Sequence, residues 1–73
     1  MILNLIVHKT DDGYTAEVPT LKGCESWAHD EDTVIKNIIE LTAYYLNIES
    51  SAFKIDKARG NRTRTVYKLV IDK

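Results

Sequence analysis

Residues 12–24 have the sequence DGYTAEVPTLKGC, and they indicate how the first half of the chain folds. The Asp12-Gly13 pair is typical of a tight hairpin turn, because glycine accepts a positive φ there. Apolar and polar residues then alternate over 14–18, as they do in a strand with one buried face. Pro19 removes a backbone donor and ends that strand. The stretch therefore predicts a strand that follows a hairpin and precedes a second turn.

Two more strands and a helix are predicted around this segment. Residues 2–8, ILNLIVH, are too few and too rich in β-branched side chains for a helix, and they indicate a strand. Residues 24–28 form a third strand whose small side chains share one face. Asp30 is a suitable N-cap, and apolar residues recur at spacings of three and four over 31–47. This pattern predicts an amphipathic helix that is buried against the sheet.

The last third of the chain permits two interpretations at its start. Within 48–63, Phe53 and Ile55 alternate with charged neighbours, which is compatible with a short strand, and a helical turn over 49–57 is equally compatible. Residues 59–62, RGNR, are typical of an exposed turn. Residues 64–71 alternate again, which indicates a final strand.

Together these elements predict a single α+β domain over residues 1–73 with the order β-β-β-α-β. The first three strands form an antiparallel meander, and the helix covers one face of the sheet. The last strand lies beside the first, and a right-handed crossover would make the two parallel. No separate DNA-binding domain is expected.

One helix leaves the other face of the sheet uncovered. Alternation places charged, aromatic and aliphatic side chains on that face, a mixture too apolar to face water without a function. We therefore predict that it binds a partner and that a homodimer forms through it, with Trp27 as the anchor. The unpaired edge of the third strand is a competing route to a dimer. The residues expected to bind the partner are Glu17, Glu25, Trp27, Val66 and Lys68, and the other members of the face are Asn4, Ile6, His8, Thr15 and Val70.

Composition excludes several classes of protein. A chain with 44% apolar and 29% charged residues is globular rather than disordered. Its one cysteine, Cys24, cannot form an internal disulfide, and one cysteine with two histidines is too small a set for a typical zinc site. The longest apolar run is far shorter than the ~20 residues of a membrane helix. The first residues do not have the pattern of a secretory signal. The sequence predicts a cytoplasmic protein that makes no membrane contact.

Charge is divided between the two parts of the chain. Residues 1–50 contain three basic and nine acidic residues, a net charge of −6, whereas 51–73 contain seven basic and two acidic residues, a net charge of +5. Such asymmetry is typical of a protein that binds a charged partner or that forms a dimer with complementary faces. Four basic residues within 57–64 could contact a phosphate backbone, or they could simply form a solvated loop. They are Lys57, Arg59, Arg62 and Arg64.

The segment 12–24 resembles the amino-terminal domain of the HicB antitoxin family, in which a D-G-x-x-A-E-x-P-x-L-x-G-C pattern precedes a short strand and an amphipathic helix. The resemblance continues into the helix and covers about residues 1–47. It implies a partial ribonuclease-H-like fold. It also implies a partner, a small basic HicA-type ribonuclease toxin that the antitoxin masks.

This resemblance in fold does not extend to nuclease chemistry. Ribonuclease-H-like nucleases hold metal ions with carboxylates, one of them in the first strand, whereas residues 2–8 contain no acid. We therefore expect a non-enzymatic binding protein without catalytic residues, metal or cofactor. The leading hypothesis is an antitoxin-like protein whose acidic body screens a basic RNA-binding partner. The alternatives are a small nucleic-acid-binding or regulatory protein that uses residues 57–64, and a stand-alone homodimer.

Overall fold

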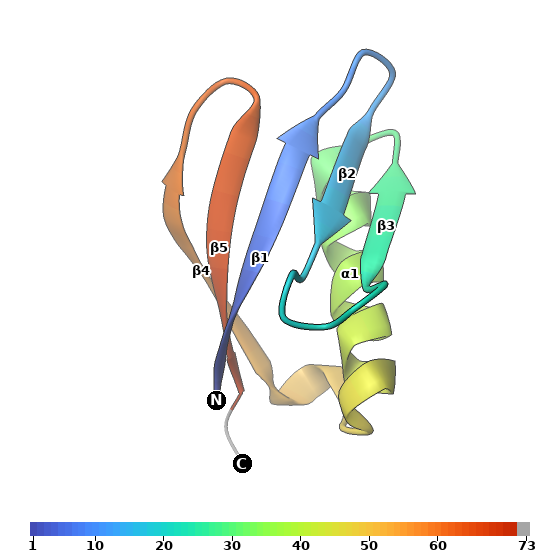
Figure 1. Cartoon of the computed structure of the whole chain (residues 1–73), viewed down its shortest axis with the longest axis vertical. Helices are drawn as coiled ribbons and strands as arrows, with labels where there is room; N and C mark the ends of the chain where they lie inside the picture. The colour runs from blue at the N-terminus through green and yellow to red at the C-terminus, as the bar shows by residue number, and fades with distance from the viewer. Residues whose placement is uncertain (72–73) are drawn as a thin grey trace.

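The computed structural model describes residues 1–71, except for the side chain of Ser50. Asp72 and Lys73, which count toward the charge of the second part of the chain, lie outside the described residues. The chain forms one five-stranded sheet with a helix against one of its faces (Figure 1). In chain order the elements are β1 (Ile2–Lys9), β2 (Tyr14–Glu17), β3 (Glu25–Ala28), α1 (Glu31–Leu46), the 3₁₀ turn η1 (Ser50–Ala52), β4 (Phe53–Gly60) and β5 (Arg64–Ile71).

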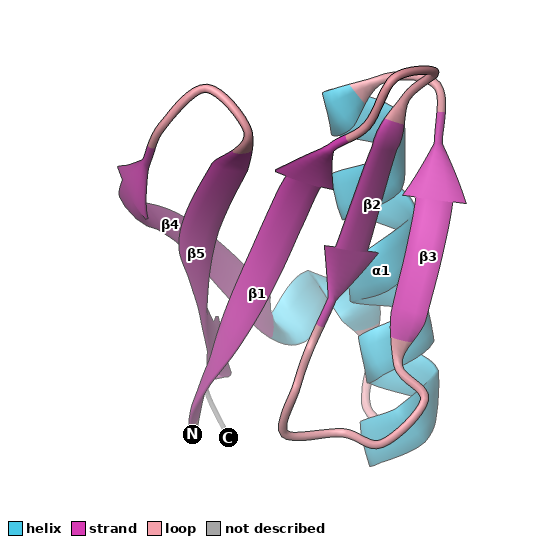
Figure 2. Ribbon diagram, turned by 45° about the horizontal axis from the view of Figure 1, so that its top comes forward, coloured by secondary structure: helices cyan, strands magenta, loops and turns pink. Residues whose placement is uncertain are grey.

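The strands lie in the order β3-β2-β1-β5-β4, and every neighbouring pair is antiparallel (Figure 2). The α+β class, the three-stranded meander and a last strand next to β1 are confirmed. The expected parallel direction of that last strand is wrong. The chain passes through β4 before it reaches β5, and the hairpin between them reverses its direction. β5 therefore runs antiparallel to β1, from Ile2 opposite Val70 to His8 opposite Arg64.

β4 is the additional strand of the sheet. It takes up eight residues of the ambiguous segment 48–63, and η1 accounts for the helical turn that the same segment permitted. The pairing register with β5 shifts between Lys57 and Arg59, which makes Ala58 the extra residue of a β-bulge. The shift places Arg59 opposite Val66, so the bulge reverses which face of the sheet the following residues occupy.

The turn between β4 and β5 lies beyond Gly60, slightly later than the expected 59–62, because β4 extends to that glycine. The side-chain oxygen of Asn61 accepts hydrogen bonds from the backbone N–H groups of Thr63, at 3.0 Å, and Arg64, at 2.9 Å. An asparagine that bonds its own following backbone in this way holds a turn in one conformation.

The turn between β1 and β2 requires a glycine for space rather than for a positive φ. Among the described residues, positive φ values occur at Gly23 (79°) and Asn47 (56°), so the conformational reason expected for Gly13 is wrong. A Cβ atom on Gly13 would instead collide with the backbone oxygen of Ala28 and lie 3.0 Å from Cζ2 of Trp27. The turn therefore packs directly against the end of β3.

α1 begins and ends close to the predicted residues. The side chain of Asp30, the N-cap, accepts a hydrogen bond from the backbone N–H of Thr33 at 3.2 Å. Asn47 has a left-handed conformation and donates its backbone N–H to the carbonyl oxygen of Tyr44, which ends the helix. No helix within the described residues has the length and the apolar character that crossing a membrane requires.

The core lies between α1 and the side of the sheet that faces it. Ile38, in the middle of α1, is fully buried in the same cluster as Ala16, Cys24 and Ala28, which belong to β2, to β3 and to the segment between them. The buried Thr42 hydroxyl donates to the carbonyl oxygen of Ile38 at 2.7 Å and lies 3.4 Å from Sγ of Cys24, so this polar group is satisfied. The cluster comprises Leu3, Leu5, Val7, Ala16, Val18, Cys24, Ala28, Val34, Ile38, Leu69 and Ile71.

Tyr67 connects β5 to the start of α1. Its hydroxyl donates a hydrogen bond to Oε2 of Glu31 at 3.3 Å. Partial burial, the negative charge of Glu31 and this hydrogen bond together raise the pKa of Tyr67 above its usual value of 10.0. The folded protein therefore keeps the phenol protonated at pH values at which the unfolded chain ionises it.

We expect a Tyr67→Phe variant to lose stability less steeply than wild type in alkali. Because the folded-state pKa is the higher one, this contribution is complete below about pH 10 and is lost as the pH rises further, when unfolding releases the proton. Urea unfolding between about pH 8 and about pH 11 measures the slope of stability against pH. Tyr44→Phe is the control, since Tyr44 is 82% exposed, and it should keep the wild-type slope. An unchanged slope in Tyr67→Phe would contradict the assignment.

Candidate functional site

The side of the sheet opposite α1 carries all the residues that the sequence predicted for partner binding; we call it the open face. Directly paired residues of neighbouring strands point to the same face, so the register arranges them in rows. One row crosses all five strands in the order Glu25, Glu17, Ile6, Val66 and Arg59. It begins with two acids, passes through two apolar residues and ends with a base. The neighbouring row consists of Trp27, Thr15, His8 and Arg64.

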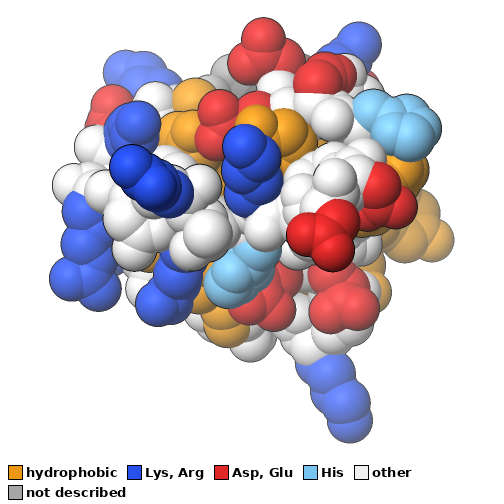
Figure 3. Space-filling view, turned by 90° about the horizontal axis from the view of Figure 1, so that it is seen from above, with side chains coloured by type: hydrophobic (Ala, Val, Ile, Leu, Met, Phe, Trp, Pro, Cys, Tyr) orange, Lys and Arg blue, Asp and Glu red, His pale blue; other side chains and the backbone are white. Residues whose placement is uncertain are grey.

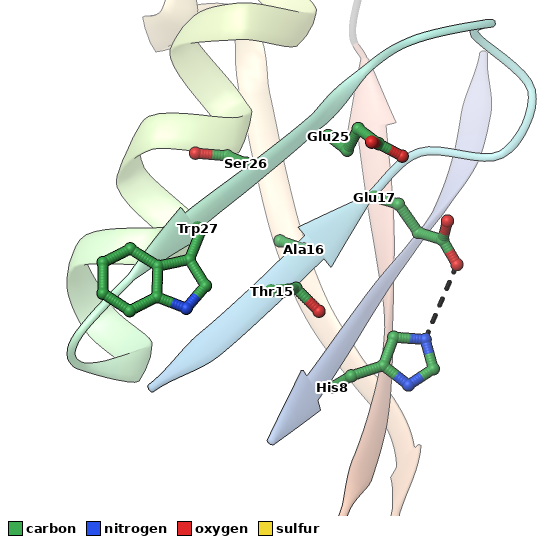
Figure 4. A pocket seen from close by; sticks show the side chains of 7 residues that line it. All are labelled: His8, Thr15, Ala16, Glu17, Glu25, Ser26 and Trp27. Carbon is green, nitrogen blue, oxygen red and sulfur yellow. Dashed lines mark ion pairs between the residues drawn. The ribbon is translucent and has the colours of Figure 1, made fainter. Parts of the chain in front are cut away.

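An open hollow of about 560 Å³ lies at the β2–β3 end of this face (Figure 4). Three of the five predicted residues, Glu17, Glu25 and Trp27, line it, and we call it the acidic hollow. Val66 and Lys68 share the face but lie outside the hollow, on β5. The complete lining is His8, Thr15, Ala16, Glu17, Glu25, Ser26 and Trp27.

Two carboxylates face each other across β2 and β3. Glu17 and Glu25 are directly opposite in the register, an arrangement in which like charges destabilise a sheet. His8 projects from β1, with Nε2 3.5 Å from Oε1 of Glu17 (Figure 4). That contact is the one ion pair among residues 1–71 when His8 is protonated, and it leaves the Glu25 carboxylate without a cationic partner within this part of the chain. The acidic hollow therefore has negative charge available for a ligand.

The indole of Trp27 forms the aromatic end of the hollow, across from the two carboxylates (Figure 4). It is 43% exposed, although its position is fixed from two sides. The ring of His29 meets it edge-on, with ring centroids 4.6 Å apart and planes at 73°. The backbone of Gly13 lies against the indole on the side of the β1–β2 turn. A large aromatic side chain held in one orientation is typical of the anchor residues of protein interfaces.

The four basic residues near the β4–β5 turn are divided between the two faces of the sheet. Lys57 lies opposite Tyr67 on the side of α1, whereas the bulge brings Arg59 to the open face. A second hollow, of about 250 Å³, lies beside the turn, and the basic residues that line it are Lys9, Lys57, Arg62 and Arg64.

The molecule is electrically polarised at the end that carries the turns. Figure 3 looks onto this end: Lys and Arg side chains gather on one side of it, and most Asp and Glu side chains lie on the other. Among residues 1–71, neither Lys57 nor any of Arg59, Arg62 and Arg64 forms an ion pair with a carboxylate. These cations are thus available to contact an anion outside the described structure.

Three titratable residues of the open face were not predicted as site residues. The sequence placed His8 on the surface of the first strand and gave it no role. In the sheet His8 is paired with Thr15 of β2, and its side chain reaches Glu17, two residues further along that strand. Lys54 and Asp56 also lie on this face, opposite Val70 and Lys68. The alternation of residues 53–57 was the available signal for them, and it was ambiguous because a helical turn fitted the same segment.

The titratable residues near the start of α1 have structural roles. Asp30 caps the helix, and Nδ1 of His29 lies 3.4 Å from the backbone oxygen of Asp12. Cys24 is a buried free thiol. In the part of the chain that the structure describes, no group of three His, Cys, Asp or Glu side chains is placed to hold a metal ion.

Comparison with known proteins adds one relative. The chain is similar to a UPF0150 protein of Helicobacter pylori strain J99, with 39% identity over 46 residues. The aligned region covers 63% of this chain and 64% of that protein, so it spans slightly less than two thirds of the relative's length. No family model matches the sequence, and no solved structure matches it.

Proposed function

We propose that this chain is a non-enzymatic, cytoplasmic binding protein of the HicB antitoxin type, which masks a small basic HicA-type ribonuclease toxin. The observation that carries this proposal is the acidic hollow, whose lining includes two opposed carboxylates and an exposed indole. Its chemistry fits an arginine or lysine of a basic partner, and an arginine best of all.

The arrangement of charge explains why a cation would bind there. Glu17 and Glu25 repel each other in the free protein, and an incoming cation converts that repulsion into attraction. An arginine guanidinium can bond carboxylate oxygens with two parallel N–H groups. It can also stack on the face of Trp27, a contact of about 0.5–2 kcal/mol. An acidic site with an aromatic wall therefore selects arginine-rich surfaces, which are common on proteins that bind RNA.

The resemblance to HicB antitoxins supports the proposal at residue level. The A-E-x-P part of the family pattern contains Glu17, and the strand after the G-C part contributes Glu25 and Trp27. The residues that carry the resemblance thus contribute to the acidic hollow. The similarity to a UPF0150 protein extends over 63% of this chain, and that relative comes from a bacterium.

The test has two steps: to look for a small basic protein encoded beside this chain in its genome, and to measure its binding by isothermal titration calorimetry together with rescue of growth when both are expressed. We expect Glu17→Gln and Glu25→Gln each to weaken binding by about tenfold or more, since a charge-assisted hydrogen bond contributes about 1.5–3 kcal/mol. Trp27→Ala should weaken binding by a similar or larger factor, because truncated interface anchors cost about 2 kcal/mol or more.

Glu40→Gln is the matched control, since Glu40 is exposed on α1, away from the open face. Equal losses in Glu40→Gln and Glu25→Gln would mean that net charge alone matters, and the acidic hollow would not be the site. The second candidate function is nucleic-acid binding, which the second hollow, beside the β4–β5 turn, favours because four basic residues line it. A salt-dependent affinity for RNA that disappears in Arg62→Glu and Arg64→Glu, with no binding of the basic protein, would favour that function instead.

A further inference from the structure

The outer edge of β4 is an unprotected strand edge. β4 ends the sheet (Figure 1), and seven of its eight residues are exposed. α1 packs mainly over β2 and β3, so it does not cover this edge. A long exposed edge presents a row of backbone donors and acceptors that another strand can pair with.

The direction of each backbone group on β4 follows from the hydrogen bonds of β5. Ile71 and Met1 exchange both of their backbone bonds, at 2.8 Å and 3.3 Å, so Ile71 points its N–H and C=O toward β1. In an antiparallel sheet alternate residues point to opposite neighbours, so Val70 and Lys68 point toward β4. Their partners Lys54 and Asp56 bond inward, and Phe53, Ile55 and Lys57 therefore point their N–H and C=O groups out of the sheet.

We propose that two copies of this chain pair through β4, antiparallel, with Ile55 of each copy on the two-fold axis. In this register Ile55 lies opposite Ile55 of the second copy, and Phe53 lies opposite Lys57 on either side. All three residues on each strand then use their outward backbone groups. Lys54 lies directly opposite Asp56 twice, once on each side of the axis, so the pairing is self-complementary, as a two-fold interface requires.

The charges on β4 select this register against its neighbours. A slip of two residues in one direction places Lys54 opposite Lys54, and a slip in the other places Asp56 opposite Asp56. Like charges directly opposite each other destabilise a sheet. The side chain of Ile55, 38% exposed in the single chain, gains an apolar partner in the proposed register. The bulge at Ala58 ends the regular edge, which confines pairing to residues 53–57.

This dimer leaves the acidic hollow free. The hollow lies over β2 and β3, at the opposite end of the sheet from β4. A two-fold axis that joins two strand edges directs both open faces to the same side of one continuous sheet. Each dimer would then present two acidic hollows in parallel, so self-association and partner binding can be tested independently.

The test is sedimentation velocity from micromolar to millimolar concentration. Wild type should sediment at twice the chain mass of 8.3 kDa. Lys54→Asp and Asp56→Lys should each sediment as monomers, because each places like charges opposite each other. Their equimolar mixture should form a heterodimer, because one strand then carries two acids and the other two bases. The doubly swapped variant, Lys54→Asp with Asp56→Lys, should be dimeric again.

Three further variants separate the strand edge from the open face. Ile55→Pro removes a backbone N–H that points out of the sheet, and it leaves every hydrogen bond between β4 and β5 intact. An edge strand accepts proline at such a position. The variant should therefore fold and be monomeric. Ile55→Val, the matched control, should remain dimeric. Trp27→Asp should also remain dimeric.

The proposal is wrong if wild type is monomeric throughout, if the mixture of the two charge variants does not associate, or if folded Ile55→Pro remains dimeric. A dimer that Trp27→Asp abolishes would be the open-face dimer expected from the sequence, and would also overturn the β4 pairing. The charge variants change only exposed side chains, so they test the β4 pairing even if the Ile55→Pro variant does not fold.

Discussion

Ile38→Ala is expected to lower the free energy of unfolding by about 2–5 kcal/mol, the range for removing a large aliphatic side chain from a protein core. Ile38 is fully buried at the centre of the helix face, and small residues lie on the sheet beneath it. Small side chains cannot extend to fill the resulting cavity, so the cost should lie in the upper part of that range. A domain of this size has a total stability of only several kcal/mol, and the variant should be partly unfolded at physiological temperature.

Urea unfolding monitored by circular dichroism measures this effect. Ile2→Ala is the matched control, because Ile2 is 64% exposed and should tolerate the same truncation with little loss. If the two variants unfold at the same urea concentration, then Ile38 does not occupy the centre of the core and the helix register is wrong.

Gly13→Ala is the second substitution with a large expected effect. The added methyl group would collide with the backbone oxygen of Ala28, and a backbone group cannot move without disturbing β3. Overpacking of a close contact typically costs about 1–3 kcal/mol, and a backbone neighbour places the expected loss at the upper end. Because Gly13 also lies against the indole of Trp27, the single tryptophan of the chain, its fluorescence spectrum should shift in the folded variant.

Gly60→Ala provides the comparison for this prediction. Its added methyl group would meet only the side chain of Thr65, at 3.0 Å and beyond, which can move aside more easily than a backbone oxygen. The melting temperature should therefore fall much further for Gly13→Ala than for Gly60→Ala. Equal melting temperatures would show that the close packing of the β1–β2 turn on β3 contributes little to stability.

The elements that the sequence predicted well are those whose residue pattern is compatible with only one type of secondary structure. The helix combined an N-cap, Asp30, with a long apolar period, and both ends were correct to about one residue. Alternation on β1, β2 and β5 was long enough to assign each side chain to a face, so the open-face residues that these strands contribute were correct before the register was known. The hollow itself required that register, because only the pairing of Glu17 with Glu25 brings two acids together.

The errors arose where local sequence leaves two structures nearly equal in energy. The segment that forms β4 contains few apolar residues, because α1 covers neither of its faces. It therefore lacks the long run of alternating apolar and polar residues by which a half-buried strand is recognised. Without β4 the chain had to return in parallel, so one missing strand produced the wrong direction for β5. Gly13 shows a different limit. The D-G pair indicated a turn correctly, but the contact that requires its glycine comes from Ala28, in a strand that the turn sequence does not contain.

The position of β1 has a consequence for how the chain acquires its structure. β1 precedes the other four strands of the sheet in chain order, yet it lies between β2 and β5, and Met1 bonds to Ile71, 70 positions away. Closing a loop of nearly the whole chain costs conformational entropy before the contacts between β1 and β5 can stabilise the structure. This cost slows folding relative to helical proteins of equal length. During translation the meander and α1 can assemble early, but one edge of β1 stays unpaired until β5 leaves the ribosome. The nascent chain thus carries an exposed strand of alternating aliphatic residues, a surface on which a chaperone can act and on which aggregation can begin.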